Sequence, residues 1–436
     1  MRTGQQLLLG EAREGRLAIG GVDAHALARE FGTPVYVMDE DRLRDNCRAY
    51  MAALRAAYPT SQAFFGSKAL CCLATCRLAY DEGLGIDVVS AGEIQTALRA
   101  GVPAGHLLFH GNNKTPDEIT LALDAGVGRI AVDNFYEFDL LDALTRRTGR
   151  AADVLLRLAP GIEPHTHQAI RTGGVDSKFG FGIHGGVARE AVMRALDIPG
   201  IHLRGLHCHI GSQVMDLEPF VLAAKAMMEF AAWMVRERET PVEELDLGGG
   251  LGIRYLPEDR PPSIEEYVQA LARAVREEAR ALQLPLPKLM LEPGRTIVGD
   301  AGVTLYTVGA VKVIPGVRTY VSVDGGMYEN PRPSLYAARY HVVLADRLDE
   351  PADTTVTIAG RCCESGDILL WDAAMPQPRP GDLLAVFSTG AYNYSMAGNY
   401  NRYPRPPIVF ARGGRARAVV ARETIDDMLR RDAPPT

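Results

Sequence analysis

The chain has 436 residues, more than the ~250–300 at which a single hydrophobic core stops growing, so two domains are expected. With 47% hydrophobic and 23% charged residues and a net charge of -7, the composition is that of an ordinary globular protein without a basic surface for nucleic acid. No run of about 18 apolar residues predicts a membrane span, and the apolar patch after Met1 is too short for a signal peptide. The 7 cysteines contain no paired CxxC units, so neither a zinc site nor a disulfide framework is indicated, and a reducing cytoplasm is the expected location.

A strand is expected at Val35–Met38, and eight further strands then alternate with helix-like stretches. The eight apolar runs are Ala63–Ser67, Ile86–Val89, Leu107–His110, Ile130–Val132, Val154–Leu158, Leu203–His209, Glu244–Leu247 and Leu289–Glu292. Capping boxes are expected at Ser263–Glu266 and Ser90–Glu93, and Asn134–Glu137 has a similar form. Eight strands separated by helices predict a closed parallel (β/α)8 TIM barrel. The alternative is an open doubly wound sheet, whose phosphate-binding glycines would lie in the first unit rather than near the end.

Beyond about residue 301 the chain becomes rich in strands. Runs at Val303–Val313, Arg318–Val323, Thr354–Ile358, Ile368–Trp371, Leu383–Phe387 and Ile408–Val420 have little helix between them, and Gly413-Gly414 indicates a hairpin turn. We therefore expect a C-terminal β-sandwich or β-barrel domain to which the N-terminal segment contributes. The expected divisions are 1–37 for that segment, 38–297 for the barrel and 298–436 for the β domain.

Lys68 ends the first barrel strand, in Ala63-Phe-Phe-Gly-Ser-Lys-Ala69. Lysine is seldom buried without a function, and (β/α)8 enzymes carry their chemistry at the C-terminal ends of the strands. A lysine amine there can form a Schiff base, because desolvation favours its neutral, nucleophilic form. Taken alone, the heptapeptide favours a lysine that merely reaches out to solvent. The downstream motifs reverse that preference.

Two histidines end the sixth strand, in Gly205-Leu-His-Cys-His-Ile-Gly-Ser-Gln213. Side chains alternate along a strand, so His207 and His209 are expected to point the same way, as in a metal-dependent TIM-barrel hydrolase. Such a site needs ligands from other strand ends, and the sequence offers no convincing set. A second pair, His165 and His167, lies in an irregular stretch. The alternative without a metal is one packed and one hydrogen-bonded histidine.

A glycine run, Leu247-Gly-Gly-Gly-Leu-Gly252, follows the seventh strand. Adjacent glycines let backbone amides approach an anion, and TIM barrels often bind phosphate near their last two strands. Ser212 lies on the neighbouring loop. The eighth strand ends in Leu291-Glu-Pro-Gly-Arg295, where Glu292 is a candidate partner for a protonated heterocyclic nitrogen. A lysine, a phosphate cradle and a carboxylate on one barrel face describe a pyridoxal 5'-phosphate site. A surface pair of Glu292 with Arg295 would explain only the last motif.

The expected β domain carries further polar motifs. Gly360-Arg-Cys-Cys-Glu-Ser-Gly-Asp367 places Cys363 beside Glu364 in a glycine-flanked loop, where a free thiol can donate a proton. Inert packing is the commoner role of tandem cysteines. Gly390-Ala-Tyr392 adds a phenol, and Pro331-Arg-Pro-Ser-Leu-Tyr336 adds an Arg–Tyr pair suited to a carboxylate.

Together these motifs resemble the fold-type III pyridoxal-phosphate decarboxylases, which have an alanine racemase-like barrel, and within them the diaminopimelate decarboxylases. The likeness runs from about residue 20 to 420, and its most specific stretches are 207–213, 245–252, 292–295, 363–367 and 390–401. Residues 165–167, Thr172-Gly173 and 177–180 add to it. The resemblance implies pyridoxal-phosphate-dependent decarboxylation of meso-2,6-diaminopimelate to L-lysine and CO2, the last step of lysine biosynthesis.

The resemblance also implies residue roles. Lys68 would form the Schiff base with the cofactor, His209 would stack on its ring and Glu292 would face its pyridine nitrogen. Further cofactor contacts would come from Ser212, Gly250, Pro293, Gly294, Arg295 and Tyr392. The distal end of the substrate would be held by Arg295, Arg332, Tyr336, Glu364 and Tyr392. Cys363, as proton donor, and Glu364 would enter from the β domain of a second subunit, so the expected assembly is a homodimer with shared active sites.

Two positions depart from the family pattern, because Ser67 replaces an aliphatic residue and Leu70 replaces an asparagine. Neither change removes a reactive group. Arg295 and Arg332 favour a substrate with a distal carboxylate, since they would repel the cationic ends of arginine, ornithine or carboxynorspermidine. Glu292 argues against an amino-acid racemase, which places an arginine at the pyridine nitrogen. Lys68 and Cys363 argue against an inactive regulatory homologue.

Overall fold

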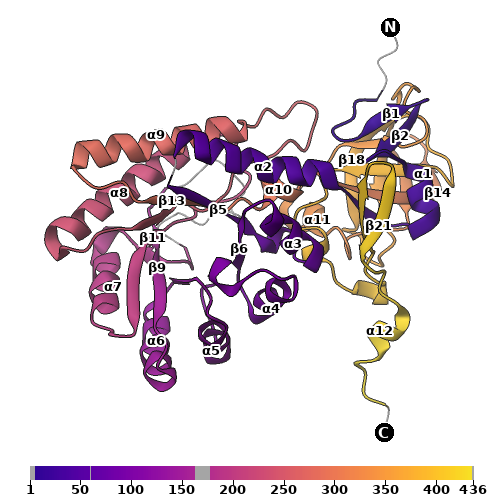
Figure 1. Cartoon of the computed structure of the whole chain (residues 1–436). Coiled ribbons are helices and arrows are strands. Elements are labelled where there is room, and N and C mark those ends of the chain that lie inside the picture. Colours follow the sequence, from indigo (N-terminus) through magenta and orange to yellow (C-terminus); the bar gives the residue numbers. More distant parts are fainter. Residues whose placement is uncertain (1–4, 59, 163–176, 435–436) are drawn as a thin grey trace. The chain divides into compact units, whose positions relative to one another are not determined.

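The chain forms two compact units that are interleaved in sequence. The computed structural model describes residues 5–58, 60–162 and 177–434. One unit, here called the β unit, comprises Met1–Leu43, Ile253–Asp259 and Ile297–Thr436. The other, the barrel unit, comprises Arg44–Gly252 and Arg260–Thr296 (Figure 1).

The barrel unit contains a closed barrel of parallel strands. In order around the barrel they are β5 (Ser61–Gly66), β6 (Gly85–Val88), β7 (Leu107–Phe109), β8 (Arg129–Val132), β9 (Ala152–Ala159), β11 (Ile201–His207), β12 (Glu244–Asp246) and β13 (Lys288–Leu291). Pairing of β13 with β5, in the register Leu289–Ser61, closes the ring, and the short β10 (Phe181–Gly182) adds to β9. The predicted (β/α)8 fold is confirmed, and the open sheet is excluded.

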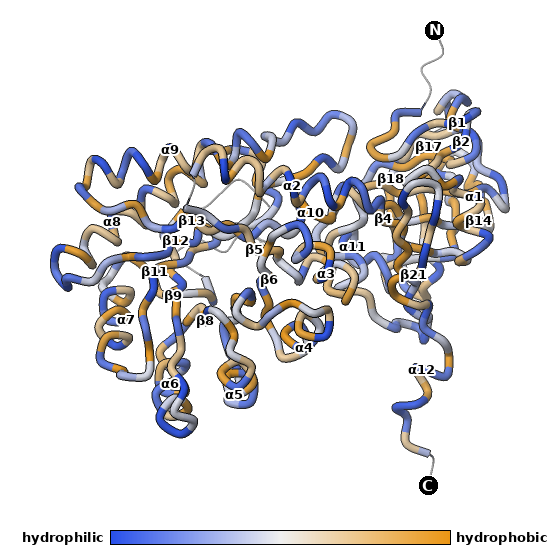
Figure 2. Tube along the Cα trace, viewed as in Figure 1, coloured by the Kyte–Doolittle hydropathy of each residue, from blue (hydrophilic) through white to orange (hydrophobic). Residues whose placement is uncertain are grey.

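Helices lie outside these strands (Figure 1). They are α2 (Glu40–Ala57), α3 (Leu73–Asp81), α4 (Ala91–Arg99), α5 (Pro116–Ala125), α6 (Phe135–Thr148), α7 (Val187–Leu196), α8 (Glu218–Arg238) and α9 (Ile264–Leu282). Hydrophobic and hydrophilic residues alternate around α9 with the helical period (Figure 2). Tyr267, Val268, Leu271 and Val275 are buried as expected, whereas Ile264 and Leu282 at its ends are half-buried. No helix in the described part of the chain is both long and apolar enough to cross a membrane.

One of the three expected capping boxes forms as a reciprocal pair. Ser263 and Glu266 exchange hydrogen bonds at the start of α9. Ser90 and Asn134 do accept from the amides of Glu93 and Glu137 and so begin α4 and α6. The two carboxylates, however, accept from the amides one residue before the cap, at 2.7 Å from Val89 and 3.0 Å from Asp133. These glutamates therefore hold the strand ends rather than complete the box.

The β unit is built on a nine-stranded sheet, with a separate three-stranded sheet near the N-terminus. The large sheet contains β4 (Val35–Asp39), β14 (Gly302–Ile314), β15 (Arg318–Val323), β16 (Val342–Leu344), β17 (Thr354–Ala359), β18 (Ile368–Met375), β19 (Leu383–Phe387), β20 (Ile408–Arg412) and β21 (Arg415–Val420). The small sheet is β1 (Glu11–Arg13), β2 (Arg16–Ile19) and β3 (Val22–Asp23), followed by α1 (Ala24–Phe31). Short helices α10 (Arg295–Val298), α11 (Arg332–Tyr336) and α12 (Ile425–Leu429) complete the chain.

The N-terminal segment contributes to the large sheet, as expected. Strand β4 pairs antiparallel with β14 and parallel with β20. Gly413 and Gly414 have φ values of 56° and 76°, so the predicted turn between β20 and β21 uses two left-handed residues. The sequence analysis missed the small sheet and β16, whose strands are only two to four residues long.

A buried ion pair joins the segment before α5 to the first turn of α6. The Lys114 ammonium donates to the Glu137 carboxylate at 2.9 Å and to the carbonyls of Ala131 and Gly111 at 2.6 and 2.8 Å. Burial lowers the pKa of Lys114, although the Glu137 charge opposes this shift. Since both side chains are 1% exposed, neither charge has water as an alternative partner.

We predict that Lys114→Met lowers the free energy of unfolding by about 3–5 kcal/mol, because it strands the Glu137 charge in the interior. Urea titration of the purified protein measures the change. The control is Lys225→Met, which breaks a half-exposed 3.8 Å pair with Glu278 and should cost less than ~1 kcal/mol. Equal effects of the two substitutions would contradict the assignment.

Candidate active site

Polar side chains gather where the barrel strands end. Lys68 lies in a single 3₁₀ turn, Ser67–Ala69, directly after β5. Its amine is 2.8 Å from the Asp87 carboxylate on β6, and the Lys68 side chain is 40% exposed while that of Asp87 is fully buried. Ser67 and Leu70 are buried, and the Leu70 amide closes the turn on the Ser67 carbonyl. The two departures from the family pattern thus pack inward and leave the Lys68 amine at the barrel mouth.

The chain segments after β5 and β13 approach closely. The Gly66 amide donates to the Pro293 carbonyl at 3.0 Å, and a Cβ on Gly294 would lie 3.0 Å from the Gly66 carbonyl oxygen. Arg295 follows, almost completely buried, and its guanidinium donates to the Ser212 hydroxyl at 2.9 Å. Closure of the barrel therefore brings the turn that carries Lys68 beside the turn at 292–295.

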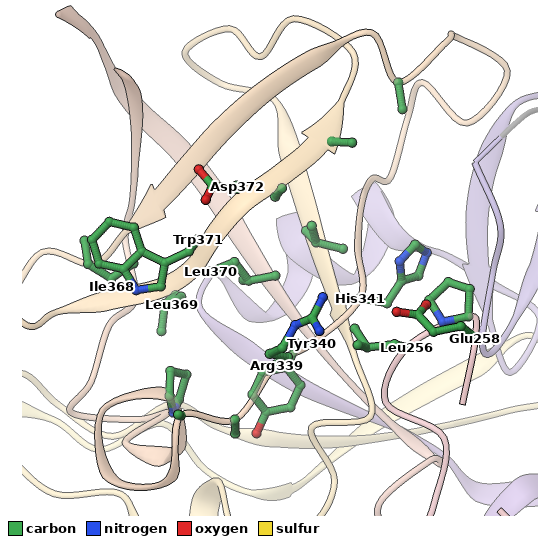
Figure 3. A pocket seen from close by; sticks show the side chains of 18 of the residues that line it. Leu256, Glu258, Arg339, Tyr340, His341, Ile368, Leu369, Leu370, Trp371 and Asp372 are labelled. Atoms are coloured by element: carbon green, nitrogen blue, oxygen red, sulfur yellow. The ribbon is translucent and has the colours of Figure 1, made fainter. Parts of the chain in front are cut away.

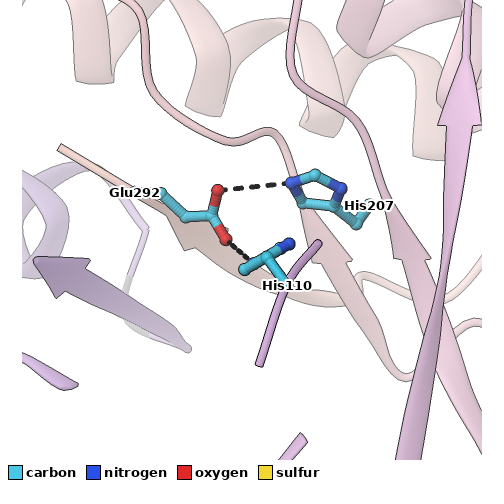
Figure 4. A group of neighbouring side chains, drawn as sticks. All are labelled: His110, His207 and Glu292. Carbon is cyan, nitrogen blue, oxygen red and sulfur yellow. Dashed lines mark hydrogen bonds and ion pairs between the residues drawn. The ribbon is translucent and has the colours of Figure 1, made fainter. Parts of the chain in front are cut away.

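The Glu292 carboxylate is held between two imidazoles (Figure 4). His207 Nε2 is 3.2 Å from Glu292 Oε2, and His110 Nε2 contacts Glu292 Oε1. Burial alone would raise the pKa of Glu292, but His110 and His207 outweigh it and hold that pKa well below its usual range. Burial lowers the pKa of His207 to about 3, so its ring is neutral at pH 7. The site thus contains an ionised carboxylate in an almost dry position.

Three other titratable groups surround this carboxylate. Burial, and next the Glu292 charge, raise the pKa of Asp246 well above its usual range, and Asp246 accepts from the Gly248 amide at 2.8 Å. Arg157 is buried, with its guanidinium 4.2 Å above the Phe179 ring. Burial and then the Lys68 charge lower the pKa of His209 well below its usual value, so this ring too is neutral. The pKa values of Asp246 and Glu292 are thus shifted in opposite directions.

The glycine run forms a cradle that a side chain would fill. Gly250 has a φ of 119°, and a Cβ there would collide with the Gly211 carbonyl. A Cβ on Gly249 would collide with the Glu292 carbonyl, and the Gly249 amide donates to His209 Nδ1 at 3.3 Å. Backbone close to Ser212, with an arginine beside it, suits a phosphate group. The donor set thus fits pyridoxal 5'-phosphate.

The HxH motif divides between two environments. Strand β11 ends at His207, so the alternation that was extended to His209 does not reach it, and the two rings have different partners. His110, His207 and Glu292 do form a group able to hold a metal ion, with ligand atoms within 4.8 Å of one another. His209 is not a member of this group. His165, His167 and Thr172 lie outside the described residues.

Sequence reasoning missed Asp87, His110, Asp246 and Arg157. The first three occupy the last residues of barrel strands or the position just after one, which was the available signal. The role of a single polar residue at a strand end can be predicted only when its side-chain partners are known, and those partners lie on other strands.

The remaining predicted residues belong to the β unit and are described within it. Arg332 is buried at the start of α11, where it donates to the hydroxyls of Tyr340 at 2.6 Å and Tyr255 at 3.1 Å. Tyr336 at the end of that helix is half-buried, as is Tyr392, whose φ is 63°. These hydrogen bonds fix the plane of the Arg332 guanidinium.

Cys363 and Glu364 are both exposed on a braced loop. The buried Asp367 carboxylate accepts from the amides of Cys362 at 2.7 Å and Met327 at 2.6 Å, and the Cys363 amide donates to Asn401 at 2.7 Å. The loop therefore presents a thiol and a carboxylate to solvent in a fixed backbone conformation.

A cavity of about 810 Å³ also lies in the β unit (Figure 3). It is bordered by apolar residues such as Leu369, Leu370 and Trp371 and by charged ones such as Glu258 and Arg339. None of the predicted site residues lines it. The cavity therefore does not define the site, despite its size.

Comparison with known proteins agrees with this chemistry. Residues 44–299 match the family model described as pyridoxal-dependent decarboxylase, pyridoxal binding domain. The chain is 50% identical to a diaminopimelate decarboxylase of Bacillus subtilis, over 97% of this chain and 96% of that protein. It is 44% identical to one of Synechocystis, over 97% and 91%. The crystal structure of diaminopimelate decarboxylase from M. jannaschii in complex with L-lysine matches with a TM-score of 0.91 and 34% identity, covering 98% of each chain. The chain therefore belongs to the diaminopimelate decarboxylase family of pyridoxal-dependent decarboxylases.

Proposed function

We propose that this protein catalyses the decarboxylation of meso-2,6-diaminopimelate to L-lysine and CO2 with pyridoxal 5'-phosphate. The observation that carries the proposal is the joint placement of Lys68, the glycine cradle and an ionised Glu292 at one barrel mouth. Near full-length similarity to diaminopimelate decarboxylases supports the choice of substrate. When bound, the cofactor supplies an electron sink for the pair left behind when CO2 departs.

We assign the cofactor contacts to the barrel unit. Lys68 offers the amine for covalent attachment, and Asp87 at 2.8 Å can hold the proton that this amine must exchange. His209 offers a neutral ring for stacking, and Ser212, Gly250 and the residues 293–295 offer phosphate contacts. Glu292 is the anion for the ring nitrogen, and Tyr392 of the β unit completes the set.

We assign substrate recognition to cations and phenols. Arg295, Arg332 and Tyr336 would bind the distal carboxylate, with Glu364 on the distal ammonium and Tyr392 beside it. The buried position of Arg332 supports this role, because two tyrosine hydroxyls orient its guanidinium before substrate arrives. Arginine and ornithine lack a distal carboxylate, and their cationic ends would be repelled by these arginines.

We further infer that the active form is a homodimer in which Cys363 and Glu364 serve the site of the partner subunit. The support is their exposure on a loop whose backbone is braced by Asp367. Cys363 would deliver the proton to Cα after CO2 leaves. All seven cysteines are free, which supports a reducing, cytoplasmic setting.

We expect Lys68→Ala to abolish turnover and to remove cofactor that borohydride can trap on the protein, because no other amine takes its place. Mass spectrometry of the reduced, digested protein locates the label. Lys225→Ala, on the exposed face of α8, serves as control and should keep both activity and label. A labelled, active Lys68→Ala protein would refute the assignment.

The substrate assignment predicts release of CO2 and lysine from meso-diaminopimelate, with neither arginine nor ornithine consumed. It also predicts that Arg332→Lys raises KM for meso-diaminopimelate by about tenfold with kcat little changed, since lysine cannot offer a planar pair of donors. Steady-state CO2 assays measure both effects. Turnover of arginine in preference to diaminopimelate would reject the substrate, and an unchanged KM would reject the role of Arg332.

The shared-site proposal predicts that Cys363→Ala loses about 10²–10⁴-fold in kcat while remaining a folded dimer. Mixing inactive Lys68→Ala with inactive Cys363→Ala should then restore ~25% of wild-type activity, because half of the dimers are mixed and each has one complete site. Cys362→Ala controls for loop damage. No recovery from refolded mixtures would show that each subunit uses its own thiol.

A further inference from the structure

Two imidazole rings contact the two oxygens of one buried carboxylate. His110 follows β7, His207 ends β11 and Glu292 follows β13, so three strands converge on a single group (Figure 4). The ring centroids of His110 and His207 are 4.6 Å apart. All three residues are at least nine-tenths buried.

The hydrogen-bond roles follow from charge. Glu292 is an anion and only accepts, so His207 donates to it through its Nε2–H, and His110 Nε2 lies in polar contact with the other oxygen. For His207 this fixes the tautomer, with the other nitrogen, Nδ1, lacking a hydrogen-bond partner among the described residues. Each carboxylate oxygen has a second lone-pair position, so Glu292 retains capacity for one more donor. The carboxylate is thus held at both oxygens without being saturated.

Several other titratable groups lie around this carboxylate. Asp87 Oδ1 is 4.0 Å from His110 Nε2, and burial and then the Glu292 charge raise the pKa of Asp246. Arg157 is the nearby cation, but the acceptor 3.6 Å from its Nε is Asp133. Lys68 pairs with Asp87, and His209 and Cys208 are uncharged. Loss of either imidazole therefore leaves a carboxylate oxygen in a dry position with one fewer donor.

We propose that His110 and His207 are positioning residues that clamp the Glu292 carboxylate, one imidazole N–H on each oxygen, and so keep it a fixed anion facing the cofactor's ring nitrogen. The clamp itself concerns only residues of this chain, whereas its last clause rests on the proposed function. A clamped Glu292 stays an anion in a fixed position and so stabilises the proton on the ring nitrogen. A Glu292 carboxyl that had turned away or become protonated would no longer do so.

The same three side chains could instead hold zinc, since two imidazoles and a carboxylate are a known ligand set for that ion. The contact between the Glu292 oxygen and His110 Nε2 leaves no room for an ion between those two atoms. Zinc binding is accordingly an outcome of the test.

The first experiment uses the apoprotein and needs no activity. Infrared difference spectra at pH 7 should show a new carboxylic-acid C=O band in His207→Leu, because Glu292 becomes protonated. The band should vanish when Glu292→Gln is added. It should be absent from His207→Gln, whose amide restores a donor. His202→Leu, on the exposed edge of the same strand, is the matched control. If His207→Leu fails to fold, His110→Leu makes the same prediction.

The second experiment follows the cofactor in the holoenzyme. With ring-¹⁵N-labelled pyridoxal phosphate, the nitrogen resonance should move from its protonated position towards the neutral one in His207→Leu and return in His207→Gln. The kcat should fall by about 10–100-fold, as for other residues that orient a contacting ligand.

The outcomes separate the clamp from the function. An unchanged infrared spectrum in both leucine variants would overturn the clamp whatever the protein binds. The new infrared band in a protein whose wild type binds no pyridoxal phosphate would leave the clamp standing and reject the proposed function. Stoichiometric zinc that is lost in His110→Gln would overturn the clamp in favour of a metal centre.

Discussion

The barrel unit depends on keeping one carboxylate charged where water hardly reaches. Glu292 is 6% exposed, and a lone ionised carboxylate in such a place would lose its charge by binding a proton. His110 and His207 prevent this, and they come from strands remote in sequence, His207 being 85 residues from Glu292. The charge of Glu292 is thus a property of the closed barrel and of no single segment.

The same closure positions the amine of Lys68. Strands β5 and β13 form the closing pair, and Lys68 and Glu292 follow them directly. Because the Gly66 amide bonds to the Pro293 carbonyl just beyond the last paired residues, the two turns cannot slide past each other. Glycine at 294 allows this approach, since a Cβ there would lie 3.0 Å from the Gly66 carbonyl oxygen and crowd it. The hydrogen bonds that complete the fold therefore also set the distance between the two chemical groups.

The sequence was sufficient for the barrel because each strand is an apolar run bounded by helix caps, and Lys68 and Glu292 stand out as charges directly after such runs. It was insufficient for His110 and Asp87, whose partners lie on other strands. The expected alternation of His207 and His209 runs past the end of β11, and the two rings have different partners. Glu93 and Glu137 were assigned to capping boxes. Instead, the Glu93 carboxylate accepts from the Val89 amide at a strand end, and the Glu137 carboxylate accepts from the buried Lys114 ammonium. Local patterns thus identify elements, whereas competition between non-local partners decides side-chain contacts.

A buried carboxylate orders the loop that carries the exposed thiol of the β unit. Asp367 is buried, burial raises its pKa, and its oxygens hold the amides of Cys362 and Met327. Neighbouring Gly326 and Gly360 leave room for this carboxylate, since a Cβ on either would collide with it. A loop that served only to connect β17 and β18 would need neither the buried carboxylate nor the two glycines. The ordering is understandable if Cys363 and Glu364 must be presented without loss of backbone entropy on docking. The cluster around Glu292 and the loop of Cys363 are thus built by separate folding units, so either can change without disturbing the core of the other.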